Sequence, residues 1–77
     1  MGVDETKTAL NYISKSIGKT VYIKLRSGAE IRGKLEGFDS HLNLILTDSD
    51  EIMEEKTKKL GKIIIRGDTV VLVSPVA

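Results

Sequence analysis

The sequence predicts a mainly β domain with one N-terminal α-helix, arranged as a small, strongly bent, five-stranded antiparallel barrel. Three observations lead to this fold class. The apolar residues have a helical period before Gly18 and a period of two after Lys19. Turn-forming pairs then divide the chain into short segments that read as strands. Two glycines, Gly33 and Gly37, would lie on the same face of the second predicted strand. This arrangement is typical of a strand that bends sharply, as a small barrel requires.

The first segment is predicted to form a helix over residues 5–17. Its apolar residues recur near helical spacing, at Val3, Leu10, Ile13 and Ile17. Asp4 is a candidate N-terminal cap, and Gly18 ends the pattern. Because the apolar stripe lies on one side only, we expect the helix to pack against the sheet that follows.

The strands are predicted from alternation and from turn signals. In the first strand Val21, Ile23 and Leu25 alternate with polar residues, and Ser27-Gly28 forms the turn. The later strands are expected over residues 29–38, 42–47, 60–66 and 69–74. Turns at Asp39-Ser40 and Gly67-Asp68 separate them, and Pro75 ends the last. The charged stretch 48–59 is a solvated connection, or a longer hairpin whose strands extend into it.

Length and composition indicate one domain, residues 1–77, that needs stabilisation from outside its own core. A chain of 77 residues buries only about 60% of the surface that its unfolded form exposes. The absence of cysteine excludes disulfides and thiolate metal sites, and a single histidine argues against a histidine zinc site. No cofactor is expected. Self-association is therefore the favoured source of extra stability.

The N-terminus does not resemble a secretory signal. Asp4 and Glu5 stand where positive charge is required, and no run approaches the ~20 apolar residues of a membrane span. The lack of cysteine also fits a reducing compartment. We therefore expect a cytoplasmic protein.

The last two predicted strands carry apolar residues on both of their faces. Ile63-Ile64-Ile65 and Val70-Val71-Leu72-Val73 resemble strands that are buried on both faces. A domain of this size cannot easily supply two cores, so we expect these strands to be subunit contacts that pair across protomers. The alternative is that the N-terminal helix covers one of the faces.

Nothing in the sequence predicts an enzyme. There is no cysteine nucleophile, and the neighbouring Ser40 and His41 would point to opposite sides of a strand. The glycines do not form a phosphate-binding loop before a helix. The net charge of +1 neither predicts nor excludes a nucleic-acid partner, because contact with phosphate depends on local charge.

Nearly the whole chain resembles the Sm-like (Sm/LSm) RNA-binding family. The first family motif is similar to residues 19–47, at seven positions in particular: Gly33, Leu35, Gly37, Asp39, His41, Asn43 and Leu46. The second motif lies within residues 60–74 and is similar to the run Ile64-Ile65-Arg66-Gly67-Asp68-Thr69-Val70-Val71. The charged connection 48–59 separates the two motifs. The Arg66-Gly67-Asp68 turn resembles the archaeal and eukaryotic branch, and the lack of a terminal extension favours an archaeal-type homo-oligomer.

The resemblance implies a fold, an assembly and a function. The family fold is a helix on a bent five-stranded barrel, within the broader group of SH3- and OB-like barrels. Its subunits join through their fourth and fifth strands into rings, usually heptamers in this branch. The implied function is to hold uridine-rich single-stranded RNA during RNA processing, decay or chaperoning, alongside other RNA-processing proteins.

The same resemblance places the RNA-binding residues at two turns, which meet at one rim of the family barrel. The candidate residues are His41, Asn43, Arg66, Gly67 and Asp68, with Asp39 as structural support. An imidazole and a guanidinium can cover the two faces of an unpaired base. An asparagine amide presents a donor beside an acceptor, which matches the Watson–Crick edge of uracil. We expect Asp68 to orient Arg66, and the backbone at Gly67 to approach the base because this residue has no side chain.

Other interpretations remain open for each feature. His41 can be an ordinary solvated histidine, Asn43 a turn former, and Arg66 with Asp68 a weak surface ion pair. The basic stretch 56–62 can line a second RNA-binding face or balance the acidic run before it. At the level of the whole protein, the rivals are an SH3- or Tudor-like module with an aromatic groove, and a ring that only serves as a scaffold for a protein partner.

Overall fold

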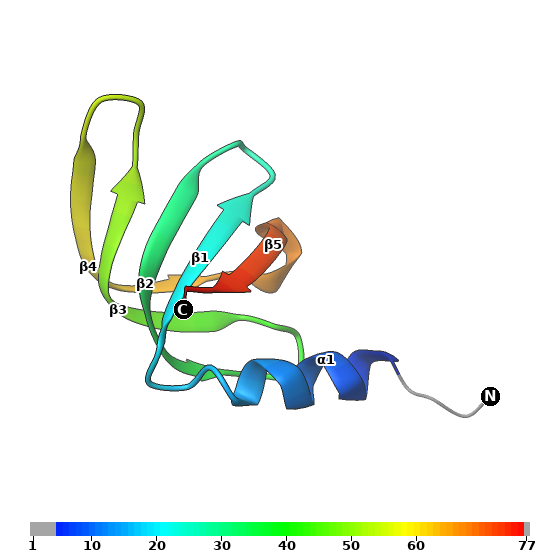
Figure 1. The fold of residues 1–77 in the computed structure, drawn as a ribbon. Coiled ribbons are helices and arrows are strands. Elements are labelled where there is room, and N and C mark those ends of the chain that lie inside the picture. The colour runs from blue at the N-terminus through cyan, green and yellow to red at the C-terminus, as the bar shows by residue number, and fades with distance from the viewer. Residues whose placement is uncertain (1–4, 77) are drawn as a thin grey trace.

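The computed structural model describes residues 5–76 and has the predicted fold class. Helix α1 (Glu5–Ser14) precedes five strands, which are β1 (Thr20–Leu25), β2 (Glu30–Phe38), β3 (Leu44–Ile52), β4 (Thr57–Ile65) and β5 (Val70–Pro75). A short 3-10 turn, η1 (Gly67–Thr69), joins β4 to β5. All neighbouring strands are antiparallel, in the order β4-β3-β2-β1-β5. The β3–β4 hairpin projects on the opposite side of the molecule from α1 (Figure 1).

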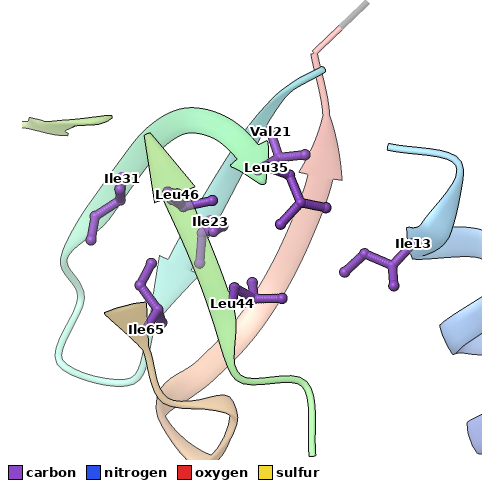
Figure 2. Close-up of a cluster of buried hydrophobic side chains, with 8 residues drawn as sticks. All are labelled: Ile13, Val21, Ile23, Ile31, Leu35, Leu44, Leu46 and Ile65. Carbon is purple, nitrogen blue, oxygen red and sulfur yellow. The ribbon is translucent and has the colours of Figure 1, made fainter. Parts of the chain in front are cut away.

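A single apolar core fills the inside of the bent sheet. In β1 and β2 every second residue is buried, as the sequence alternation requires. The core consists of Ile13, Val21, Ile23, Ile31, Leu35, Leu44, Leu46 and Ile65. Ile13 reaches this cluster from α1, so the helix closes one open end of the barrel (Figure 2). The predicted packing of the helix on the sheet is therefore confirmed.

Helix α1 ends earlier than the sequence pattern predicts. It stops at Ser14, and single turns carry the chain on to Gly18, which has a φ of 82°. Ile17 consequently leaves the packing face and is 42% exposed. Val3 and Asp4, assigned to the apolar stripe and the cap, lie outside the described residues. No helix in residues 5–76 is both long and apolar enough to cross a bilayer.

Strands β3 and β4 differ from their predicted ranges. Strand β3 begins at Leu44 rather than residue 42, because Leu42 has a φ of 61° and cannot continue a strand. The charged connection is the longer hairpin: β3 extends to Ile52, β4 starts at Thr57, and only residues 53–56 form the turn. Strand pairing continues through the acidic residues, although an irregularity at Asp48, whose φ is 50°, moves the buried positions from Leu44 and Leu46 to Ser49.

Only one of the two glycines on β2 is required by a close approach. A Cβ atom at Gly33 would lie 2.8 Å from the Cβ of Ser49 on β3, where the register of both strands shifts. At Gly37 the nearest atom would be 3.9 Å away, which is ordinary contact. On β2, the close approach of β3 therefore requires glycine at position 33 and not at position 37.

The apolar residues on the last two strands lie at the edges of the sheet. Strands β4 and β5 are its two outermost strands. Ile64 is 72% exposed, Val71 63% and Leu72 48%. Helix α1 borders β5 across an apolar groove of about 390 Å³ but leaves these three side chains accessible. Coverage by the helix therefore does not explain why the last two strands carry apolar residues on both faces.

Candidate nucleic-acid interface

Two loops that are distant in the sequence meet at one end of the sheet. Residues 39–43 lead from β2 into β3, and residues 66–69 follow β4. Leu44 at the start of β3 pairs with both Phe38 on β2 and Ile65 on β4. The sheet register therefore places the loop before Leu44 beside the loop after Ile65.

Asp39 organises the first loop. Its Oδ1 accepts hydrogen bonds from the backbone N–H groups of His41 and Asn43, at 2.9 and 3.0 Å. Its Oδ2 accepts a third from Asn43 Nδ2 at 2.9 Å. Hydrogen bonds from the Asn43 side chain and then its backbone lower the pKa of the Asp39 carboxyl, because they stabilise its charged form. The loop is thus built around an ionised carboxylate.

The same bonds hold Leu42 in a left-handed conformation. Its φ is 61°, a region that residues other than glycine seldom occupy. The N–H of Leu42 donates to the Asp39 carbonyl at 3.0 Å, and its side chain packs against the core. The turn at this residue interrupts the Leu42-Leu44-Leu46 alternation on which the strand prediction depended.

Gly67 joins the two loops. Its backbone N–H donates to Asn43 Oδ1 at 2.7 Å. A Cβ atom at this residue would overlap the His41 carbonyl oxygen and lie 2.9 Å from the Leu42 carbonyl carbon. The missing side chain is therefore required by the close approach of the other loop, and access of a base to the backbone here stays a prediction. The empty space is filled by the other loop.

Arg66 and Asp68 form the outer part of the second loop. Arg66 Nη2 lies 3.3 Å from Asp68 Oδ2, and both side chains are mostly exposed. Pairs of this kind contribute little to stability. Thr69 supports the turn through its Oγ1, which donates to the Arg66 carbonyl at 2.6 Å. Arg66 is thus oriented by Asp68 while its guanidinium stays accessible.

A hollow of about 800 Å³ opens between the loops and includes all six predicted residues. It is lined by Phe38, Asp39, His41, Asn43, Ile45, Ile64, Arg66, Gly67 and Asp68. Phe38, Ile45 and Ile64 were not predicted as site residues. They provide an apolar wall beside the polar groups. The exposed Ile64 within an apolar run was a signal that could have identified this wall.

The hollow has the chemistry of a recognition site. The Asn43 side-chain amide has two N–H donors and two acceptor positions. One of the donors bonds to Asp39, and one of the acceptor positions receives the N–H of Gly67. Among the described residues, one donor and one acceptor of this amide therefore have no protein partner. The imidazole of His41 and the guanidinium of Arg66 are flat groups on the same hollow. Within residues 5–76, no three side chains of His, Cys, Asp or Glu are grouped so as to hold a metal ion.

The basic stretch 56–62 lies away from the hollow. Lys59 is directly opposite Asp50 across the β3–β4 hairpin, and Lys58 is opposite Glu51. Lys62 forms an ion pair with Glu36 at 3.3 Å. The register therefore favours charge balance over a separate basic face.

Comparison with known proteins gives consistent matches. The family model described as LSM domain matches residues 11–75. An snRNP Sm-like protein of Archaeoglobus fulgidus is 46% identical over 67 residues, covering 86% of this chain and 87% of the relative. The crystal structure of the P. aerophilum SmAP1 heptamer has a TM-score of 0.88 at 44% identity, covering 91% and 95% of the two chains. The Pyrococcus abyssi Sm protein, solved in complex with a uridine heptamer, has a TM-score of 0.82 at 44% identity, covering 87% and 96%.

Proposed function

Because this chain belongs to the LSM-domain family, we propose that it is an RNA-binding ring subunit that holds uridine-rich single-stranded RNA between its two loops. The observation that carries the proposal is the Asn43 amide, which keeps one donor and one acceptor free in a hollow shared with His41 and Arg66. The solved relative with a bound uridine heptamer supports the choice of ligand.

Each uracil is held by stacking and by its edge. The imidazole of His41 covers one face and the guanidinium of Arg66 the other, and such stacking contributes on the order of 1–3 kcal/mol per base. The free N–H of Asn43 donates to O4, and its free acceptor receives the N3 proton. Cytosine reverses both roles, and each unpaired group costs about 1–3 kcal/mol. Arg66 also approaches the phosphate.

The ring forms through strands β4 and β5, and we propose seven subunits. Both are sheet edges, and both expose apolar side chains, notably Ile64 and Val71. Pairing the edge of one copy with that of the next buries this surface and removes the exposed edges. The solved P. aerophilum relative is a heptamer. Several identical pockets on one rim then raise the affinity for a long RNA by ~10²–10⁴.

The ring acts without catalysing a reaction. It presents bound RNA in RNA processing, decay or chaperoning, and other RNA-processing proteins act on what it holds. We also propose a cytoplasmic location.

The two rival functions are separable from this one. An aromatic groove would require the aromatic side chains to converge. Phe38 lies in the hollow, whereas Tyr12 belongs to α1 and Tyr22 to β1, and neither lines the hollow. A scaffold ring that carries only a protein partner would leave Asn43 and Arg66 without a ligand. Uridine binding distinguishes the scaffold from our proposal.

The test is oligo-uridine and oligo-cytidine binding by the native assembly and by Asn43→Ala, at two salt concentrations. The proposal predicts a uridine preference that the substitution removes while the assembly mass is unchanged. Asn11→Ala, an asparagine substitution on the exposed face of α1, is the matched control and should retain the preference. An intact assembly that binds both oligomers equally and weakly would favour the scaffold function.

A further inference from the structure

An exposed ion pair crosses strand β3 on the outer face of the sheet. Lys62 Nζ on β4 lies 3.3 Å from Glu36 Oε1 on β2, and β3 runs between these two strands. The two side chains lie on the face opposite the core, because the core fills the inside of the sheet. They remain 68% and 51% exposed, and pairs this exposed contribute little to stability. Another anion can therefore replace the Glu36 carboxylate with little loss.

This ion pair stands at the end of the apolar wall of the hollow. Ile45 and Ile64 are direct partners across β3 and β4, and both line the hollow. Side chains two residues apart on a strand share a face and are separated by about 7 Å. Lys62 precedes Ile64 by two residues. Its ammonium group is therefore a cation directly beyond the wall, although Lys62 does not line the hollow itself.

The sugar–phosphate chain of a bound base has few directions open to it. In the proposed function Asn43 holds the base by its Watson–Crick edge, and His41 and Arg66 cover its two faces. The ribose is attached to the opposite side of the ring, so it points away from Asn43. The apolar wall also leads away from Asn43, along β3 and β4. A chain that crosses this wall brings its next phosphate to Lys62.

We infer that Lys62 is a phosphate-binding residue at the border of the hollow, and that Glu36 neutralises it when no RNA is bound. The inference rests on the proposed uridine-binding function. On binding, a phosphate replaces the Glu36 carboxylate at the Lys62 ammonium. An ammonium group has three rotatable donors and acts as a point charge, which suits a phosphate on a flexible strand. Charge balance in the free protein and a contact with RNA are thus compatible.

The first test compares uridine, which has no phosphate, with the dinucleotide UpU, which has one. Lys62→Gln should weaken UpU binding by the native-sized assembly about threefold and leave uridine binding unchanged. With long oligo-uridine, the plot of log affinity against log salt should become shallower by about 0.7 for each subunit contacted. Lys62→Arg keeps the charge and should keep most of the affinity. Unchanged UpU binding by Lys62→Gln would overturn the inference.

Glu36→Gln should have the opposite effect. It removes the partner that the phosphate must displace, so UpU binding should become about twofold stronger. The double variant Glu36→Gln with Lys62→Gln shows whether this gain acts through the ion pair. We expect it to bind UpU as Lys62→Gln alone does. A gain that persists without Lys62 would assign the effect to general charge and overturn the inference.

The matched controls remove the same charges from the same strands. Lys59 lies on β4 and Glu30 on β2, and neither lines the hollow. Their register partners are Asp50 and Lys24, far along the strands from the apolar wall. Lys59→Gln and Glu30→Gln should therefore bind UpU as the native protein does. Effects as large as those at Lys62 and Glu36 would show that position is irrelevant and would reject the inference.

The outcomes separate the inference from the function on which it rests. A native assembly whose uridine preference does not depend on Asn43 would reject the proposed function, and the inference with it. A preference that depends on Asn43, with UpU binding that ignores Lys62, would reject the inference alone. Mass is measured on the same samples, because Lys62 lies on an edge strand. If Lys62→Gln dissociates the assembly, Glu36→Gln decides, since β2 lies inside the sheet, and no gain over Glu30→Gln would reject the inference.

Discussion

At the scale of single residues, the site depends on four short hydrogen bonds and one missing side chain. Asp39 gathers its own loop, Asn43 bridges to the second loop, and Gly67 lets the two backbones touch. His41 and Arg66 make no comparable anchoring bond to the opposite loop among the described residues, so they remain available to a ligand. Asp39 and Gly67 thus position the site, whereas Asn43 both bridges the loops and belongs to the proposed base-contacting set.

Gly67→Ala should separate the loops. The added Cβ would overlap the His41 carbonyl oxygen, and that neighbour is backbone, which cannot rotate away. We expect a loss of unfolding free energy on the order of 2 kcal/mol and loss of most oligo-uridine binding. Chemical denaturation and binding on the same samples measure both. Gly37→Ala, whose new Cβ meets only an ordinary contact at 3.9 Å, is the control. Equal behaviour of the two variants would contradict the role of Gly67.

The pH dependence of the loop follows from Asp39. Its folded-state pKa is lowered, chiefly by the hydrogen bonds from Asn43, below the usual value of 3.8. The contribution of the carboxylate to stability is therefore fully present above about pH 4 and is lost as the pH falls through the folded pKa. Nuclear magnetic resonance should show the Asn43 side-chain amide signals constant from pH 7 to 5 and shifted below 4. A shift centred between pH 5 and 7 would contradict this assignment.

At the scale of secondary-structure elements, periodicity predicted the helix and every strand, and local geometry decided their ends. The alternation of Val21 and Ile23 directly reflects burial inside the barrel. The continued apolar spacing to Ile17 did not reveal that α1 ends at Ser14, because turns keep a similar spacing. Leu42 continued the apolar alternation of the sequence, but its backbone is turned out of the strand, with its N–H donating to the Asp39 carbonyl.

Gly33→Ala tests the bend of β2. The new Cβ would lie 2.8 Å from the Cβ of the buried Ser49, and 3.3 Å from Leu46. Overpacking of this kind typically costs about 1–3 kcal/mol of unfolding free energy. Gly37→Ala on the same strand should cost much less, and urea denaturation compares the two. A similar cost at both positions would show that the loss of a glycine, rather than the close approach of β3, is responsible.

At the scale of the whole molecule, the sheet ends in two apolar edges. Their double-sided pattern predicted subunit contacts from sequence, because a chain of 77 residues cannot bury both faces alone. The pairing of distant loops into one hollow was expected only through the family resemblance. Composition and spacing do not specify which turns meet, and the apolar wall of Phe38, Ile45 and Ile64 depends on the sheet register.

Val71→Asp should dissociate the assembly. Val71 is 63% exposed on the edge strand β5 and does not line the hollow, so a charge here opposes subunit pairing while leaving the pocket residues unchanged. We expect mass measurement to give smaller species, and long oligo-uridine to bind ~10²–10⁴ more weakly. Binding of a single uridine nucleotide should change little. Ile17→Lys, a comparable change away from both edges, is the control, and dissociation by it as well would count against a specific edge contact.

The central claim is that uridine occupies the hollow between residues 39–43 and 66–68, and photocrosslinking tests it most directly. Oligo-uridine would be irradiated on the native assembly, and the crosslinked residues identified by mass spectrometry. Our account predicts crosslinks concentrated at His41 and Arg66 or their immediate neighbours. Crosslinks confined to α1 or to the β3–β4 hairpin, with none in the two loops, would contradict it.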